Sequence, residues 1–332
     1  MHSSKHILVL GGAGFIGSHM VLALQEAGYI PVVLDNLSKG HREAVGRAEL
    51  MVADVADNAA LSALFQKYPF AAVMHFASFI EVGESVQKPL LYYQNNVAST
   101  LNLFAAMLKH QVKHFIFSSS AAVYGEPRYS PIDEKHPLNP INPYGRSKLM
   151  LEQIIQDLAR SHGLRFAILR YFNAAGADPK GRLRERHQPE SHLIPLILQA
   201  ATGEREQITI YGDDYSTPDG TCVRDYIHVT DLCQAHLLAL KQLLNNGEDI
   251  ICNLGTGEGY SVREVIDMVQ QVINRKIPVV HGARRAGDPA VLVADAALAM
   301  QQLQWQPQYS DLQTIIRHAW HAFAIEKNKE LA

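Results

Sequence analysis

Three polar side chains of this sequence have the types and the spacing of an acid–base centre. Tyr144 and Lys148 are four residues apart, and Ser120 ends a run of three serines. Asn142 can cap a helix that begins at Pro143, which places the tyrosine and the lysine on one helix face. A tyrosine with an ordinary pKa of about 10 is a base near pH 7 only if positive charge stabilises its phenolate. We predict Tyr144 as the base, Lys148 as the charge that lowers its pKa, and Ser120 as the hydroxyl that steers the proton.

A glycine-rich turn follows the first apolar run of the chain. Gly11, Gly14 and Gly17 precede a predicted helix that runs to about Gly28. Glycines let the backbone turn tightly and approach a pyrophosphate, whose charge the helix N-terminus favours. Asp35 ends the next apolar run, where a carboxylate can bind the adenosine ribose hydroxyls and would repel a 2′-phosphate. The pattern predicts NAD rather than NADP, although glycines alone could serve only a tight turn.

The elements that must position these groups are visible in the apolar pattern. From residue 5 to about 170, short apolar runs alternate with longer amphipathic stretches, which indicates buried strands joined by helices. After residue 172 the elements become shorter and more mixed. We predict an α/β fold with a Rossmann-type doubly wound parallel sheet over residues 1–172 and a smaller C-terminal α/β substrate lobe over residues 173–332. Some late segments should return to the sheet.

Composition and charge exclude some classes of partner and indicate a compartment. The chain has 332 residues, of which 47% are hydrophobic, and its net charge of −3 includes no run of like charges. Nothing in this pattern attracts nucleic acid or an anionic membrane. The three cysteines lack a CxxC spacing, and no signal peptide or membrane span is visible, so we expect a cytoplasmic protein.

Sixteen histidines raise the question of a metal site. His110 and His114 are four residues apart at a helix-to-strand junction, and His318 and His321 lie in a terminal amphipathic stretch. No carboxylate completes a ligand set around the first pair, and the HExxH motif is absent. We therefore expect no metal.

Ten longer strings are spread over nearly the whole chain, namely GGAGFIGSH, LDNLS, HFA, VGESVQKPLLYYQNNV, FSSSAAVYG, PYGRSK, LRYFNAAGA, DGTCVRDYIHV, NLGTG and RRAGDPA. In content and order they resemble the extended short-chain dehydrogenase/reductase family, and most closely its members that epimerise nucleotide sugars at C4. The resemblance implies tightly held NAD and a UDP-hexose substrate. It implies interconversion of UDP-glucose and UDP-galactose through a 4-keto sugar that turns over and is reduced on its opposite face. It also implies a homodimer built on residues 89–109 and 143–161.

The resemblance assigns roles residue by residue. The implied catalytic residues are Ser120, Tyr144 and Lys148. The residues implied to bind the cofactor are Gly11, Gly14, Phe15, Ile16, Gly17, Asp35, Asn36, Asp54, Val55, Phe76, Ala77, Asn95, Tyr144, Lys148 and Phe172. The residues implied to bind the substrate are Ser120, Tyr144, Asn173, His192, Leu193, Ile210, Tyr211, Arg224, Arg285, Asp288 and Leu292.

Several of these positions have alternatives or departures. Arg224 and Arg285 resemble a pair that binds the substrate diphosphate, yet without the resemblance Arg224 would be interpreted as a surface ion pair with its neighbour Asp225. Ile80 stands where some members carry a lysine close to the cofactor, which puts one polar contact and NAD retention in question. Leu292 stands where some members place a tyrosine beside the sugar, so UDP-GlcNAc and UDP-GalNAc are further candidate substrates.

Two other functions compete with epimerisation. The same scaffold supports sugar-nucleotide 4,6-dehydratases and decarboxylases, but a dehydratase needs an Asp-Glu pair after its Ser or Thr. Here the corresponding residues are Ala121 and Ala122, which cannot transfer protons. A non-enzymatic NAD-sensing regulator could keep the fold, but it would have no use for Tyr144 and Lys148 together with Ser120.

Overall fold

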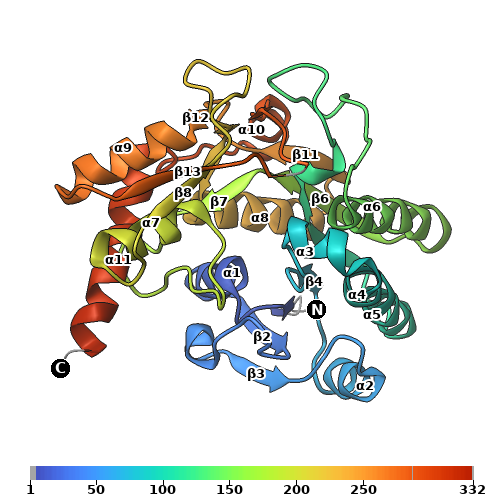
Figure 1. Cartoon of the computed structure of the whole chain (residues 1–332). Helices are drawn as coiled ribbons and strands as arrows, with labels where there is room; N and C mark the ends of the chain where they lie inside the picture. Colours follow the sequence, from blue (N-terminus) through green and yellow to red (C-terminus); the bar gives the residue numbers. More distant parts are fainter. Residues whose placement is uncertain (1–4, 286, 331–332) are drawn as a thin grey trace.

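The computed structural model describes residues 5–285 and 287–330, the last three of them by backbone only. A seven-stranded parallel sheet with the order β11-β6-β5-β4-β1-β2-β3 forms its centre (Figure 1). Its strands are β1 (His6–Leu10), β2 (Ile30–Asp35), β3 (Glu49–Val52), β4 (Ala72–His75), β5 (His114–Ser120), β6 (Arg165–Tyr171) and β11 (Ile250–Leu254). The predicted doubly wound sheet is confirmed, and β11 is a late segment that returns to it.

Alternating side chains attach helices to both faces of the sheet. In β1, Ile7 and Val9 enter one apolar core, whereas Leu8 and Leu10 enter the core on the opposite face. The first core includes α1 (Phe15–Glu26), α8 (Val229–Leu244) and α10 (Ala297–Leu303). The second includes α2 (Asn58–Lys67), α5 (Ser99–Lys109) and α6 (Pro143–His162). The sheet is thus covered on both sides, which leaves its carboxyl edge for a ligand.

The strand order reverses between β1 and β4. From β1 the chain crosses to β2 on one side, and from β4 it crosses to β5 on the other, so a crevice opens beyond their carboxyl ends. Gly11 follows β1 with a φ of +73°, and a Cβ there would lie 2.6 Å from the backbone nitrogen of Ala77, which follows β4. A residue with a side chain would push these two turns apart.

Residues 89–109 form a helical path with a change of winding inside it. The path consists of α4 (Pro89–Tyr92), the π-helical turn η2 (Tyr93–Ala98) and α5. Asn96, in the π turn, is fully buried; it accepts a hydrogen bond from the backbone of Phe79 (2.9 Å) and donates one to Ser147 Oγ (3.1 Å). The wider turn thereby connects the loop after β4 to α6.

A second lobe covers the carboxyl edge of the sheet. Its core is shared by α7 (Leu193–Thr202), α9 (Val262–Ile273) and α11 (Leu312–Glu330). Small sheets join it to the first lobe: β7 (Asn173–Ala175) with β10 (Tyr226–His228), β8 (Ile208–Tyr211) with β13 (Val279–Gly282), and β9 (Val223–Arg224) between β12 (Tyr260–Ser261) and β14 (Val291–Leu292). Three short helices complete the description: η1 (Arg42–Val45), α3 (Val82–Gln87) and η3 (Ala121–Val123). Within residues 5–285 and 287–330, no helix is long and apolar enough to cross a membrane.

Gly17 gives a test of the packing at the glycine turn. A Cβ at this position in α1 would collide with the carbonyl oxygen of Gly11 and lie 2.8 Å from its carbonyl carbon, whereas a Cβ at Gly83 in α3 meets nothing within 4 Å. We expect Gly17→Ala to lower the free energy of unfolding by about 1–3 kcal/mol through overpacking. Gly83→Ala should change it by less than about 1 kcal/mol. Urea denaturation followed by circular dichroism measures both, and equal effects would contradict the packing described for Gly17.

Candidate active site

A cavity of about 860 Å³ at the carboxyl edge of the sheet brings together most of the predicted site residues. The predicted cofactor residues on its wall are Gly11, Gly14, Phe15, Ile16, Gly17, Asp35, Asn36, Asp54, Val55, Phe76, Ala77, Asn95, Tyr144 and Phe172. The predicted substrate residues on its wall are Ser120, Tyr144, Asn173, His192, Leu193, Tyr211, Arg224, Arg285, Asp288 and Leu292. Lys148 and Ile210 do not line it.

Ser120 and Tyr144 meet because a strand end and a helix start converge. β5 ends at Ser120, and α6 begins at Pro143 with Asn142 as its N-cap. The Asn142 side chain accepts a hydrogen bond from the backbone of Gly145 (2.8 Å), so the predicted cap is confirmed. The Ser120 hydroxyl lies close enough to Tyr144 to lower its pKa as a hydrogen-bonding partner, and Tyr144 is 8% exposed. A substrate hydroxyl that reaches this pair can exchange a proton with it.

Burial acts on the ionisation of both Tyr144 and Lys148. Burial raises the pKa of Tyr144, and the hydrogen bond from Ser120 only partly offsets that rise. Lys148 Nζ lies 5.8 Å from the centre of the Tyr144 ring and donates hydrogen bonds to Ser78 Oγ and the Ser118 carbonyl, both at 2.9 Å. Burial lowers the pKa of Lys148 itself to about 7. Desolvation thus dominates the pKa of Tyr144 among these residues, and the lowering of this pKa by Lys148, expected together with a nicotinamide cation, stays a prediction.

A buried carboxylate lies one helical turn beyond Lys148. Glu152 is fully buried; it accepts hydrogen bonds from Ser119 Oγ (2.5 Å) and from the guanidinium of Arg170 (2.9 and 2.5 Å). Its charge raises the pKa of Lys148, against the larger effect of burial. The sequence carries a signal for Glu152, since it is four residues after Lys148, but none for its pairing with Arg170 on β6.

The glycine turn fits a dinucleotide. Gly14 is the N-cap of α1 and supplies no side-chain hydrogen bond, which leaves the first amides of that helix for an anionic ligand. The Asp35 carboxylate accepts hydrogen bonds from the backbone of Ala13 (2.9 Å) and Leu37 (2.8 Å), which fixes it at the cavity wall. Asn36 donates to Asp54 (2.7 Å) at the same end. Amides for a pyrophosphate and a carboxylate for a ribose thus lie in the order that NAD requires.

The opposite end of the cavity carries two arginines. Arg224 is mostly buried and lies 3.5 Å from the Asp288 carboxylate, while the Arg285 guanidinium stacks 4.1 Å above the Tyr211 ring. Asp225 is turned away and accepts hydrogen bonds from backbone amides, including that of Thr256 (2.8 Å). The alternative of a surface pair between Arg224 and Asp225 is therefore wrong.

The remaining predicted residues divide between wall and core. Leu292 and Ile80 line the cavity as apolar side chains. Ile210 is 2% exposed, and its side chain enters the core of the second lobe because neighbouring residues of a strand point to opposite sides. Ser78, His187 and Glu190 also line the cavity, and no motif in the sequence pointed to them.

His192 is the N-cap of α7 and pairs with acidic residues. Its Nδ1 lies 2.5 Å from Glu185 Oε1. Burial lowers the pKa of His192, but the carboxylates of Glu185, Glu190 and Glu81 outweigh this effect and raise it to about 9. The imidazole is thus cationic at neutral pH when only a proton compensates these carboxylates.

Comparisons with known proteins extend over nearly the whole chain. The model of the NAD dependent epimerase/dehydratase family matches residues 7–255. A UDP-glucose 4-epimerase of Halalkalibacterium halodurans is 50% identical over 315 residues, which is 95% of this chain and 94% of that protein. The crystal structure of a UDP-glucose 4-epimerase from Brucella ovis in complex with NAD has a TM-score of 0.93 and 51% identity, covering 96% of this chain and 98% of that one. That of a UDP-glucose 4-epimerase from Bifidobacterium longum in complex with NAD+ and UDP has a TM-score of 0.92 and 39% identity, covering 97% and 99%.

Burial of Lys148 makes stability depend on pH. Between its folded pKa of about 7 and its ordinary value of 10.5, the unfolded chain holds a proton that the folded protein lacks. The free energy of unfolding therefore rises with pH across this window, by at most about 1.4 kcal/mol per pH unit. From pH 7 to pH 9, wild type should gain roughly 2 kcal/mol relative to Lys148→Met in urea denaturation. The exposed residue Lys109 supplies the control, since Lys109→Met should track wild type at both pH values.

Proposed function

The chain belongs to the NAD dependent epimerase/dehydratase family, and on this premise we propose that it interconverts UDP-glucose and UDP-galactose by inverting C4 of the hexose. The observation that carries the proposal is a single cavity with a Ser120–Tyr144 proton pair between a dinucleotide turn and a pair of arginines. The relatives named UDP-glucose 4-epimerase, and the neighbours solved with NAD or with NAD+ and UDP, support the same reaction.

The cofactor end is the glycine turn. When bound, NAD supplies the acceptor and the donor of hydride for C4 of the sugar. The free amides at the start of α1 would hold its pyrophosphate, and Asp35 would hold its adenosine ribose. Because Gly11 has no side chain, the backbone of the glycine turn can approach the pyrophosphate closely.

Tyr144 performs the proton chemistry in this proposal. Its phenolate oxygen takes the proton from the sugar 4-hydroxyl as C4 becomes a carbonyl, and returns that proton when C4 is reduced. Ser120 holds the same oxygen in place through its hydroxyl. Since burial raises the pKa of Tyr144, further positive charge in the cavity would favour its ionisation.

The nucleotide end must stay fixed while the hexose turns over. Arg224 and Arg285 present forked donors suited to the diphosphate oxygens, and Asp288 can accept hydrogen bonds from the uridine ribose. These three residues lie beyond residue 173, whereas Ser120 and Tyr144 lie before it. We propose that the first lobe carries NAD and the proton pair and that the second lobe mainly carries UDP.

The competing dehydratase gains no support from the site. Ala121 and Ala122 directly follow Ser120 in η3, and both line the cavity. Neither can transfer a proton at C5 or C6 of the sugar. A decarboxylase and an NAD-sensing regulator likewise have no specific contact in their favour.

Incubation of the purified protein with UDP-galactose tests the function. We expect UDP-glucose as the product, without loss of water and without consumption of added NAD. Loss of water, or no turnover by protein loaded with NAD, would contradict epimerisation. UDP-GlcNAc in a parallel reaction examines the further substrate class for which Leu292 leaves room.

Tyr144→Phe removes the proton acceptor while keeping the ring. We expect kcat to fall by about 10²- to 10⁴-fold, because general acid–base catalysis is lost. UDP affinity, measured by isothermal titration calorimetry, should change by less than about twofold. Tyr129→Phe is the matched control, because Tyr129 is exposed, its hydroxyl donates to Asp133 (2.6 Å), its ring contact with His136 is kept by phenylalanine, and kcat should be unchanged. Undiminished turnover by Tyr144→Phe would exclude it as the base.

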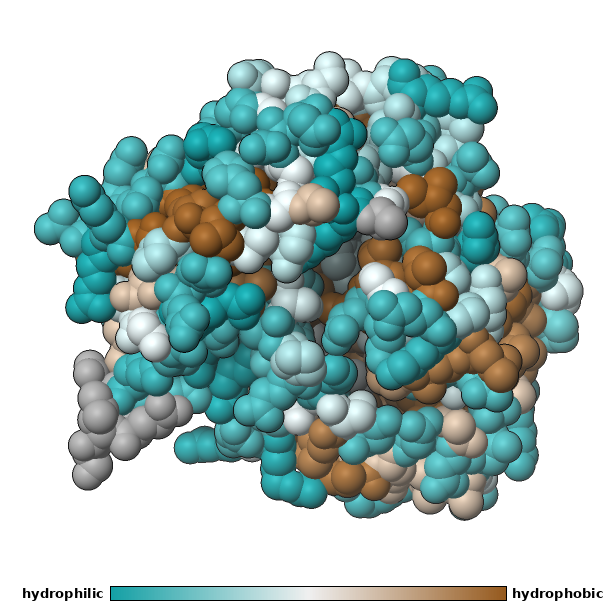
Figure 2. All heavy atoms as spheres, viewed as in Figure 1, coloured by the Kyte–Doolittle hydropathy of each residue, from teal (hydrophilic) through white to brown (hydrophobic). Residues whose placement is uncertain are grey.

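We also propose a homodimer through the helices on one side of the sheet. Leu90 (66% exposed), Leu101 (46%) and Met150 (41%) lie on α4, α5 and α6. Figure 2 shows hydrophobic side chains gathered along the right-hand side of the molecule, where Figure 1 places these helices. An apolar surface of this kind is typical of a protein–protein contact.

Charge placed on this surface tests the homodimer. We expect Leu101→Glu and Met150→Glu to weaken self-association at least about 10-fold, since each buries an uncompensated carboxylate in the contact. Met300→Glu on α10 is the control, because Met300 is equally exposed (41%) outside these helices. Sedimentation equilibrium measures all three. A monomeric wild type, or variants that dimerise as the control does, would contradict the proposed interface.

We propose the cytoplasm as the compartment. Cys222, Cys233 and Cys252 are all buried free thiols. Free buried thiols are the usual state of cysteine in a reducing compartment.

A further inference from the structure

Four potential metal ligands gather in one short segment before α7. We call them the Glu/His cluster, and its members are Glu185, His187, Glu190 and His192. One ligand atom from each residue lies within 4.8 Å of those from the other three. Three of the four residues line the large cavity, so the cluster forms part of its wall.

The spacing of these atoms is close to that of a tetrahedral site. His187 Nδ1 lies 3.4 Å from both Glu185 Oε1 and Glu190 Oε1. With metal–ligand distances of about 2.0–2.2 Å, the edges of a tetrahedron are about 3.3–3.6 Å long. His192 Nδ1 lies 2.5 Å from Glu185 and 3.9 Å from Glu190, so it would move by about 1 Å or less to complete the tetrahedron.

The two carboxylates lack a permanent counter-charge. The side chains of Glu185 and Glu190 are each 5% exposed, and no lysine or arginine within residues 5–285 and 287–327 forms an ion pair with them. The nearby arginines are committed elsewhere, since Arg184 and Arg186 both pair with Glu326. Glu190 also accepts hydrogen bonds from the backbone amides of Ser191 (2.9 Å) and His192 (3.0 Å), but amides carry no net charge, so a cation that enters beside the two buried carboxylates is strongly stabilised.

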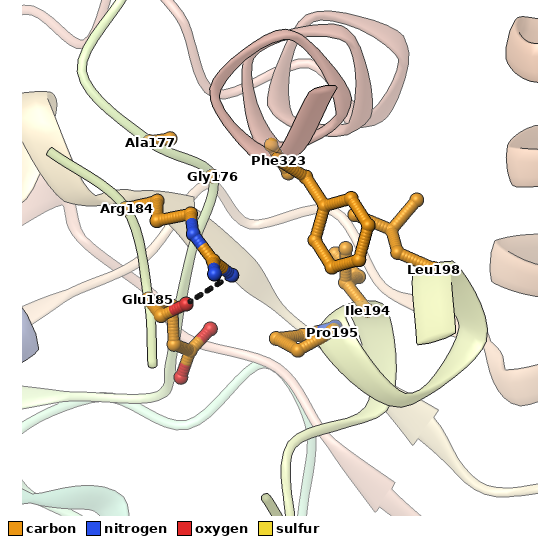
Figure 3. Close-up of a pocket in the computed structure, with 9 residues that line it drawn as sticks. Gly176, Ala177, Arg184, Glu185, Ile194, Pro195, Leu198 and Phe323 are labelled. Atoms are coloured by element: carbon orange, nitrogen blue, oxygen red, sulfur yellow. Dashed lines mark hydrogen bonds between the residues drawn. The ribbon is translucent and has the colours of Figure 1, made fainter. Parts of the chain in front are cut away.

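Figure 3 shows how Glu185 is turned. The Arg184 guanidinium donates to the backbone carbonyl of Glu185 (3.4 Å), and the Glu185 carboxylate points away from that guanidinium. The Glu185 carboxylate therefore contacts the imidazoles of His187 and His192 rather than the Arg184 guanidinium.

We propose that the Glu/His cluster binds one divalent transition-metal ion, with Zn²⁺ the best fit. Two neutral imidazoles and two carboxylates carry a charge of −2, which a divalent ion neutralises. Mixed nitrogen and oxygen donors in a tetrahedron favour zinc, whereas Mg²⁺ and Ca²⁺ favour oxygen donors and higher coordination numbers.

The ion would act on the cavity without joining the proton chemistry. Each histidine binds it through Nδ1, which leaves Nε2 as a donor for an anionic ligand. The ion also neutralises the charge of two glutamates beside a cavity that must accept diphosphates. In addition, it links the segment of residues 185–192 to the start of α7. The site and its test do not depend on the proposed function, since neither requires a sugar nucleotide.

The expectation of no metal was drawn from the spacing of other histidines along the sequence. His110, His114, His318 and His321 form pairs without a carboxylate, whereas the Glu/His cluster lies in a segment that reads as a polar loop. Its pattern, Glu-x-His-x-x-Glu-x-His, becomes a ligand set only when the loop folds back on itself.

Zinc titration of tag-free, chelator-treated protein tests the proposal. By isothermal titration calorimetry, and by elemental analysis after dialysis, we expect one zinc per chain with a Kd below about 1 µM. His187→Ala and Glu185→Gln should each weaken binding at least 10-fold and should remove the rise of Tm that zinc gives wild type. Circular dichroism of both variants checks that they fold.

A second histidine–carboxylate pair supplies the matched control. His281 Nδ1 lies 3.4 Å from the Asp213 carboxylate on an exposed surface, and His281→Ala should keep the stoichiometry and affinity of wild type. Absence of zinc binding tighter than about 10 µM in wild type would overturn the proposal. Binding that survives in folded His187→Ala and Glu185→Gln, or that is lost in His281→Ala, would also overturn it.

Discussion

The buried carboxylate of Glu152 joins the three elements that build the reactive centre. It lies on α6, accepts a hydrogen bond from Ser119 on β5 and pairs with Arg170 on β6. The positions of Ser120, which follows Ser119, and of Lys148, one turn before Glu152, are therefore set by the same charge. A buried ion pair adds little net stability, but removal of one partner leaves an uncompensated charge, so the three elements keep one arrangement.

Local signals in the sequence were sufficient for the groups that lie next to one another along the chain. The Asn142 cap, the shared helix face of Tyr144 and Lys148, and the glycine turn each depend on a few consecutive residues, and each is present. The order of apolar runs was sufficient for the doubly wound sheet. Most residues assigned through the family resemblance line one cavity.

The properties that could not be predicted depend on contacts across the fold. The pKa of Tyr144 follows from its burial, which spacing does not give. Arg224 pairs with Asp288, 64 residues away, rather than with its neighbour, because Asp225 is bound by backbone amides. The neighbours Ile210 and Tyr211 point to opposite sides of β8, so only Tyr211 lines the cavity. The Glu/His cluster forms only when a loop folds back on itself.

The π turn between α4 and α5 works as a phase shift. An α-helix advances 100° per residue, so a straight helix would keep one fixed set of faces from end to end. The wider turn contains one additional residue and rotates everything after it. Tyr92 before the turn and Asn95 within it line the cavity, whereas Leu103 and Met107 after it enter the apolar core of the sheet. The continuous helical path from α4 to α5 thus has two separate contact faces. Residues on one face can change in sequence without displacing the other face.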